Sequence, residues 1–168
     1  ALGREWQLGT IQLDFSLPER FDLEYVNEEG QRARPVMVHR AMLGSLERFM
    51  GVLIEHFAGA MPPWLSPSQV LIIPIADRHI DKALELKSIL VGDNIRVDID
   101  SRNERMNSKI REGQMNKIPY MVILGDKEIE LEVLSVRLRT GENIQSIAIE
   151  DFAHIINDKI DKRSIELW

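Results

Sequence analysis

The sequence has 168 residues, of which 44% are hydrophobic and 29% are charged, and its net charge is −6. This composition excludes a disordered or collagen-like chain and fits one or two globular domains. Because the chain has no cysteine, disulfides and thiolate metal sites are excluded, and any metal would need histidine and carboxylate ligands. The acidic pI near 5.3 argues against a protein whose whole surface grips nucleic acid, but it allows a local basic patch.

The two features that bear on location and completeness are the apolar runs and the first residues. No apolar run approaches the roughly 18 to 20 residues of a membrane span, and no basic segment followed by an apolar core opens the chain. We therefore expect a soluble, cytoplasmic protein. The chain begins Ala1-Leu2-Gly3 rather than with methionine, and a strand-like segment follows soon after. This start is typical of a piece of a longer protein.

The N-terminal region predicts two paired strands and a helix. Apolar and polar side chains alternate over Gly9–Phe15, as in a half-buried strand. A second apolar run, Pro35–His39, follows the polar, turn-rich stretch Asn27–Gln31, so the two runs are expected to pair antiparallel. Apolar residues from Leu43 to Phe57 recur at the spacing of an amphipathic helix, and the proline-rich segment Pro62–Pro67 then marks a boundary.

Strands and helices alternate after that boundary. Strands are expected at Val70–Ile75, Ile95–Ile99, Tyr120–Leu124 and Val133–Leu138, helices at Ile80–Val91, Asn103–Asn116 and Ile149–Ile160, and a turn at Gly125–Lys127. This alternation predicts an α/β fold, with a mixed sheet that carries helices on its faces.

His39 closes the second expected strand. A single histidine in a strand is commonly a structural hydrogen-bonding residue, and a metal ligand is the alternative. Zinc needs three or four protein ligands, and the chain's other three histidines show no metal-binding spacing with His39. The chain alone therefore predicts no complete metal site, and any zinc would be shared with residues outside it.

Gly44-Ser45 and Arg48 lie in the early turns of the first expected helix. Free backbone N–H groups and a fork-shaped guanidinium suit a phosphate. The alternative is an ordinary helix start with an arginine on a solvated face. The spacing leaves both open.

A basic stretch reverses the acidic balance of the chain locally. From 102 to 117 it contains Arg102, Arg105, Lys109, Arg111 and Lys117 against Glu104 and Glu112, and Arg137 and Arg139 lie on a neighbouring expected strand. Together with Asn103, these side chains suit the bases and phosphates of unstacked RNA better than duplex readout. The alternative is a solvated helix face.

These residues together resemble the threonyl-tRNA synthetases. The strings that carry the resemblance are Gly3–Phe15, Pro35–Phe49, Lys109–Glu112, Ile118–Met121 and Gly125–Glu128. The resemblance covers essentially the whole chain, and His39 to Arg48 is similar to motif 3 of class II synthetases. The stretch after about Thr140 matches least specifically.

The resemblance implies that residues 1–61 are the C-terminal end of a class II catalytic domain. The implied site residues of this part are Gln7, Thr10 and Arg48 for ATP, Gln12 and Ser45 for threonine, and His39 for zinc, with Arg48 also catalytic. The zinc would be shared with residues missing from this chain, and ATP with Mg would be a substrate of the parent enzyme. Because motifs 1 and 2 are absent, we expect the isolated chain to be inactive.

The resemblance also implies that residues 66–168 are an anticodon-binding domain of class IIa, with a mixed sheet of about five strands and helices on both faces. The implied anticodon-binding residues are Asn103, Lys117, Glu128 and Arg137. Glu128 and Arg137 together would offer an acceptor and donors to a guanine edge. Lys117 keeps a charge without the planar fork of arginine, so we expect it to contact a phosphate.

Two functions follow from these implications. The first is the C-terminal part of a threonine-tRNA ligase, whose partners are tRNA(Thr), ATP, threonine and a second copy of the enzyme. The alternative is a non-enzymatic RNA- or protein-binding module. Gln7, Thr10, His39 and Arg48 favour the ligase, because a binding module has no evident need for them at these spacings.

Overall fold

A computed structural model describes residues 3–168 of the chain. The chain divides into two compact units, Ala1–Phe57 and Ala58–Trp168. No helix among the described residues is both long and apolar enough to cross a membrane.

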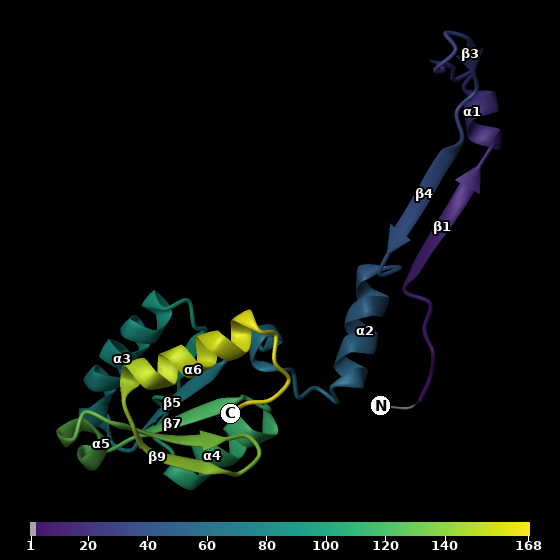
Figure 1. The fold of residues 1–168 in the computed structure, drawn as a ribbon. Coiled ribbons are helices and arrows are strands. Elements are labelled where there is room, and N and C mark those ends of the chain that lie inside the picture. The colour runs from purple at the N-terminus through teal and green to yellow at the C-terminus, as the bar shows by residue number, and fades with distance from the viewer. Residues whose placement is uncertain (1–2) are drawn as a thin grey trace. The chain divides into compact units, whose positions relative to one another are not determined.

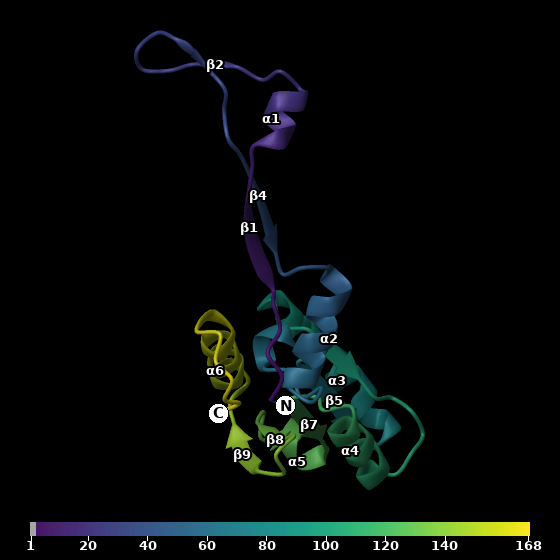
Figure 2. The ribbon, with the colours of Figure 1, turned by 90° about the vertical axis from the view of Figure 1, so that its right-hand side faces the viewer.

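The N-terminal unit is built on one antiparallel strand pair. Strand β1 (Gly9–Asp14) runs beside β4 (Met37–Met42), with Gln12 opposite His39 (Figure 1, Figure 2). The expected pairing is therefore confirmed. The partner strand begins later than Pro35 and continues to Met42, since Pro35 has no N–H to give to a ladder.

Short elements fill the excursion between β1 and β4. They are α1 (Ser16–Arg20) and the small hairpin of β2 (Tyr25–Val26) and β3 (Arg32–Ala33). None of the three was predicted, because two to five residues are too few to show a period.

Helix α2 (Leu46–His56) follows β4. The expected start at Leu43 is wrong, because Leu43 and Gly44 have φ values of 66° and 63° in the left-handed region. Ser45 is the N-cap instead, and its Oγ accepts a hydrogen bond from the Arg48 N–H at 3.2 Å.

The C-terminal unit contains one five-stranded sheet in the order β6-β5-β7-β8-β9. Its strands are β5 (Val70–Pro74), β6 (Val97–Ile99), β7 (Tyr120–Leu124), β8 (Leu134–Leu138) and β9 (Asn143–Ile147). The first three are mutually parallel, and β8 and β9 add antiparallel neighbours. The expected mixed sheet is thus confirmed.

Helices cover both faces of this sheet, as expected. They are α3 (Ile80–Gly92) and α6 (Ile149–Asp161) on one face and α4 (Met106–Met115) on the other (Figure 1). Successive residues of β5 and β7 pack alternately into the two cores, one on each face of the sheet. Val70, Ile72 and Val122 lie on the α3 and α6 side, whereas Leu71, Ile73 and Met121 lie on the α4 side.

One glycine allows α4 to lie close to the sheet. A Cβ at Gly113 would come within 2.8 Å of the Met121 sulfur and 3.1 Å of a Leu71 methyl carbon. The helix backbone therefore packs where a side chain would otherwise stand.

Two expected boundaries in this unit are wrong for local reasons. Helix α4 begins at Met106 rather than Asn103, because the Asp100 carboxylate binds the Arg102 N–H and holds a turn there. Strand β6 begins at Val97, because the Ile95 N–H still bonds to the Leu90 carbonyl after the left-handed Asn94.

The expected turn at Gly125–Lys127 opens a short helix, α5 (Asp126–Glu130). Strand β9 was not predicted, since only Ile144 and Ile147 are apolar in it and a bulge interrupts its pairing with β8. Two single turns, η1 (Pro63–Leu65) and η2 (Asp77–His79), complete the unit.

Candidate functional site

Glu128 is held rigidly at the carboxyl end of β7. Its Oε2 accepts the Gly125 N–H at 3.1 Å, and its Oε1 accepts the Ser135 hydroxyl at 2.8 Å. Gly125 permits this closeness, because a Cβ there would lie 2.7 Å from the Ile75 Cδ1 atom and 3.1 Å from the Glu128 carboxylate. The half-buried carboxylate therefore has a fixed position.

Asp126, the first residue of α5, fixes the helix that carries Glu128. Its carboxylate accepts hydrogen bonds from Arg78 at 2.5 Å and 3.0 Å and contacts the buried His79 ring at 2.9 Å. The Arg78 guanidinium, and next the His79 contact, hold the pKa of Asp126 well below its usual range. A charged carboxylate thus ties α5 to η2.

Arg137 lies on β8, opposite Met121 of β7. Its Nη1 donates to the Asn143 amide oxygen at 3.0 Å. Its Nε is buried and has no hydrogen-bond partner within residues 3–168. A buried donor left unpaired costs about 1 to 3 kcal/mol. Arg137 is only half-buried, so the other N–H groups of its guanidinium can donate to a ligand.

Ser135 bonds to Glu128 and lies on the same strand as Arg137. Ser135 and Arg137 are two positions apart on β8 and therefore share a sheet face, about 7 Å apart along the strand. This is the face that α4 covers over β5 and β7, where its residues are apolar. On β8 the same face is polar and half-buried, so this part of the sheet offers an acceptor and donors to a ligand.

Asn103 lies in the exposed loop between β6 and α4. Its side chain makes no hydrogen bond with any described residue. It lines a polar hollow of about 270 Å³, together with Asp77, Arg102, Glu104 and Lys109 among others. Its amide is free to donate and to accept.

Lys117 lies at the other end of α4, before β7. Its backbone is left-handed, with φ at 57°, and its ammonium group donates to the Ala58 carbonyl. Arg139 lies beside it and donates to the carbonyls of Met61 at 2.5 Å and Lys117 at 3.3 Å. Both cations lack a carboxylate partner among the described residues, which suits a phosphate.

The four expected anticodon residues are therefore distributed around α4. Glu128 and Arg137 are connected only through strand β8, where Ser135 bonds to Glu128 and lies two residues from Arg137. Asn103 precedes α4 and Lys117 follows it, separated by a helix of about 15 Å. Sequence reasoning missed Ser135 as the link and Asn143 as the partner of Arg137. The signal for Ser135 was a polar residue between buried Leu134 and Val136; Asn143 lay on the strand that was not predicted.

The N-terminal unit brings several of its expected site residues to one face of the β1–β4 pair. Thr10, Gln12 and Asp14 alternate along β1, and His39 lies opposite Gln12. The His39 Nε2 is 3.0 Å from the Asp14 Oδ2. The Leu17 amide, and to a smaller degree His39, lower the pKa of Asp14, whose Oδ1 also caps α1 through Ser16 and Leu17.

The remaining residues flank this face. Gln7 precedes β1, and its Nε2 is 3.5 Å from the Gly9 carbonyl. Ser45 and Arg48 share the first turn of α2 through the cap described above. A side chain in this turn has free backbone N–H groups beside it, which suits an anionic group.

The residues of this chain do not by themselves form a metal site. Across residues 3–168, no group of three or more His, Asp or Glu side chains gathers as ligands would, and the His39 Nε2 already faces Asp14. A single imidazole beside one carboxylate leaves zinc short of its usual four ligands.

Two family models match this architecture. The model of the anticodon binding domain matches residues 69–159, and the model of the tRNA synthetase class II core domain (G, H, P, S and T) matches residues 1–57. The chain therefore belongs to the family of anticodon-binding domains.

Curated relatives are similar in sequence to nearly the whole chain. It is 54% identical over 165 residues to a threonine–tRNA ligase of Desulforamulus reducens and 50% identical to one of a Sulfurihydrogenibium species, covering 98% of this chain and 26% of each relative. It thus spans about a quarter of the length of these curated relatives. A solved structure, the RNA-binding domain of threonyl-tRNA synthetase from Cryptosporidium parvum, is 34% identical with a TM-score of 0.82, over 99% of this chain and 41% of that one. The expected resemblance and fold are confirmed.

Proposed function

We propose that this chain is the part of a threonine–tRNA ligase that reads the anticodon of tRNA(Thr) and supplies one side of the active site. The observation that carries the proposal is the presence, in one chain, of a class II core match and an anticodon-binding domain with a polar, partly unpaired sheet face. The parent enzyme would activate threonine with ATP and Mg and transfer it to tRNA, in the cytoplasm and as a homodimer.

In the anticodon-binding domain, Glu128 and Arg137 would read one base together. A carboxylate accepts from the amino and imino groups of guanine, and a guanidinium donates to its acceptors. Ser135 and Gly125 hold the carboxylate in place before RNA arrives, so little ordering cost remains to be met on binding. Asn103 would contact a second base, and Lys117 a phosphate.

In the class II unit, Gln7, Thr10 and Arg48 would line the ATP site, with Arg48 as the catalytic arginine against adenine and triphosphate. Gln12 and Ser45 would contact threonine. His39 would be one ligand of a zinc ion completed by residues outside this chain; such an ion would select threonine through its amino and hydroxyl groups. Asp14 would orient the imidazole through the contact at 3.0 Å.

The relatives support this ligase over a non-enzymatic binding module. The match includes the first 57 residues as well as the anticodon-binding domain. A module that only binds RNA or protein would not need the β1–β4 pair with its polar face.

The proposal is tested by measuring how the chain binds the anticodon stem-loop of tRNA(Thr) and stem-loops with one anticodon base exchanged. Arg137→Ala should weaken discrimination at one base by about 1 to 3 kcal/mol, the range of a good bidentate contact. Lys117→Ala should instead weaken every stem-loop about equally and flatten the salt dependence, because it removes only a phosphate contact.

Arg163→Ala is the matched control, because it removes the same charge beyond α6, the helix of the opposite sheet face. It should leave discrimination unchanged. An equal loss on cognate and exchanged anticodons in Arg137→Ala would remove its base-reading role and leave a purely electrostatic surface.

A further inference from the structure

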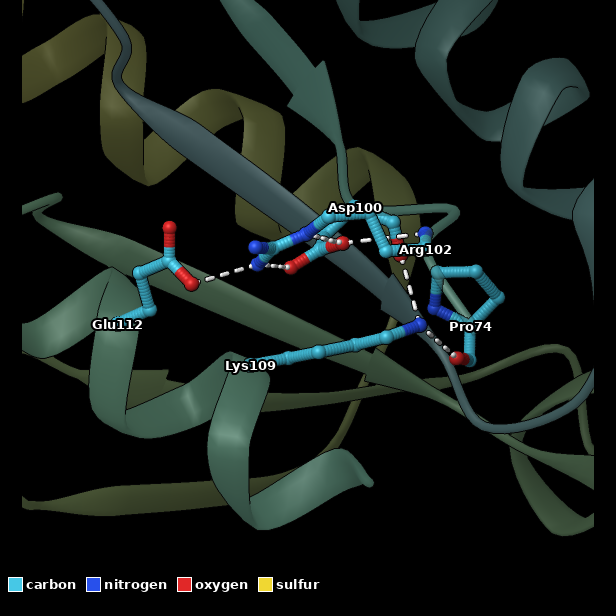
Figure 3. A network of polar contacts seen from close by, with 5 residues as sticks. All are labelled: Pro74, Asp100, Arg102, Lys109 and Glu112. Atoms are coloured by element: carbon cyan, nitrogen blue, oxygen red, sulfur yellow. Dashed lines mark hydrogen bonds and ion pairs between the residues drawn. The ribbon is translucent and has the colours of Figure 1, made fainter. Parts of the chain in front are cut away.

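A charged network joins the loop of Asn103 to helix α4 (Figure 3). Its members are Asp100, Arg102, Lys109 and Glu112, with the Pro74 carbonyl at the end of β5. Two of these side chains come from α4 and two from the loop, so the network fixes the loop to the helix at two points.

Lys109 makes the first connection. Its side chain is 4% exposed, and its Nζ donates to the Asp100 carbonyl at 2.9 Å and to the Pro74 carbonyl at 3.5 Å. A buried ammonium group is costly unless it is well hydrogen-bonded. These carbonyls end β6 and β5, so Lys109 holds both strand ends against α4.

Arg102 makes the second connection. It donates to both oxygens of the buried Asp100 carboxylate, at 2.9 Å and 2.6 Å, and to Glu112 of α4 at 2.7 Å. The Arg102 hydrogen bonds are the main cause that lowers the pKa of Asp100. The loop backbone is therefore held on both sides of Ser101, at Asp100 and at Arg102, and Arg102 directly precedes Asn103.

We propose that Lys109, Arg102 and Glu112 are positioning residues that hold the 100–104 loop so that Asn103 meets its anticodon base. The inference rests on the proposed function. Asn103 is exposed, and the hydrogen bonds of Asp100 and Arg102 hold the loop directly before it. Ordering before binding favours recognition, because an immobilised loop loses less entropy when RNA binds.

Glu112 gives the test, because positioning and simple electrostatics predict changes in two different quantities, discrimination at one base and affinity for every stem-loop. Glu112→Gln removes a negative charge from an exposed position on α4. Electrostatics alone would make the chain bind every stem-loop more tightly. Positioning instead lowers discrimination at one base, the base that Asn103 contacts.

The experiment is a double-mutant cycle on stem-loop binding with the 168-residue chain. Asn103→Ala, Glu112→Gln and the double variant are compared on the cognate stem-loop and on stem-loops with each anticodon base exchanged. Glu112→Gln should reduce discrimination about five- to ten-fold at the position that responds to Asn103→Ala, and it should have no further effect in the Asn103→Ala background. Glu150→Gln, on α6, is the control for loss of a carboxylate.

Hydrogen exchange supplies a second readout. In Glu112→Gln the amides of residues 101–104 should exchange faster, while those of β5 and β7 keep their protection. Lys109→Met should do the same more strongly if it folds; Glu112→Gln, at a surface position, carries the test if it does not.

The outcomes separate this inference from the proposed function. Loss of discrimination that persists in the Asn103→Ala background, a uniform change in affinity, or no change would overturn the positioning role while anticodon reading stands. An Asn103→Ala variant that keeps full discrimination would overturn it as well. A chain that binds all stem-loops alike would refute the proposed function itself.

Discussion

The two units of this chain differ in how much of their apolar surface they bury. In the C-terminal unit, β5 and β7 are almost wholly buried between helices. In the N-terminal unit, Ile11 and Leu13 of β1 are 67% and 62% exposed, and α2 has no buried residue. The comparison teaches that a sequence can specify strands and a helix without specifying a core.

The same difference separates the two candidate sites. Glu128 and Arg137 lie by a sheet that has cores on both faces, and two hydrogen bonds hold the Glu128 carboxylate in place. Three of the expected ATP, threonine and zinc residues, Thr10, Gln12 and His39, lie on a two-stranded pair, which is marginal in water by itself.

The largest expected effect is a complete absence of threonine activation and of bound zinc. The 168-residue chain should neither activate threonine nor retain zinc, because one imidazole leaves the coordination of the metal to water. ATP–pyrophosphate exchange and metal analysis after dialysis are the measurements. Stoichiometric zinc in the purified chain would contradict a shared site. It would also show that the N-terminal unit, like the C-terminal unit, holds its site residues in place.

The next effect concerns local stability. Amides of β5 and β7 should be protected from hydrogen exchange about a thousand-fold more strongly than those of β1 and β4, whose open edges and exposed faces allow easy local opening. Mass spectrometry of peptides from both units measures this. Equal protection in both units would contradict the difference in burial. If that protection rose with protein concentration, self-association of the N-terminal unit would explain it.

A matched pair of truncations sharpens the comparison at single residues. Leu90→Ala in α3 removes a fully buried side chain and should cost about 2 to 5 kcal/mol of unfolding free energy. Ile11→Ala should cost less than about 0.5 kcal/mol, because its side chain is exposed already. Urea unfolding followed by circular dichroism tests the pair, and similar costs would show that Ile11 is covered in solution.

The smallest effect is a pH dependence in the C-terminal unit. Because the pKa of Asp126 is lowered, chiefly by Arg78, its stabilising contribution is present above about pH 4, the ordinary aspartate value. It is lost as the pH falls toward the lowered value. Asp126→Asn should therefore flatten the loss of stability below pH 4.

Salt provides the control for this pair, because the Asp126 and Arg78 side chains are 69% and 66% exposed. High salt should reduce the difference between wild type and Asp126→Asn. If wild type and Asp126→Asn lost stability equally at low pH, carboxylates other than Asp126 would be the cause.

Much of the fold follows from the sequence where burial is two-sided. The runs at Val70–Ile75 and Tyr120–Leu124 are continuously apolar because helices cover both faces of their strands. Strand β9 escaped prediction because it is an edge strand whose register shifts opposite β8. Its place comes from pairing, which no local pattern records.

The site was predictable as residue types and not as an arrangement. Glu128 and Arg137 were expected to act together, but the hydroxyl of Ser135 that links their surroundings depends on the register of β8 with its neighbours. Asn103 was expected at a helix start, but a carboxylate at Asp100 keeps it in a loop. Long-range ion pairs such as Arg78–Asp126, 48 residues apart, leave no local signature.

Gly113 is a position at which any substitution is expected to destabilise this domain. Every substitution there adds a Cβ that meets Met121 and Leu71 at 2.8 Å and 3.1 Å, although alanine would otherwise favour the helix by up to about 1 kcal/mol. Overpacking of about 1 to 3 kcal/mol exceeds that gain. Since α4 joins the loop of Asn103 to Lys117, a shift of the helix would move both ends together. A substitution at Asn103 or Lys117 therefore changes one end of α4 by itself, whereas one methyl group at position 113 would displace both ends.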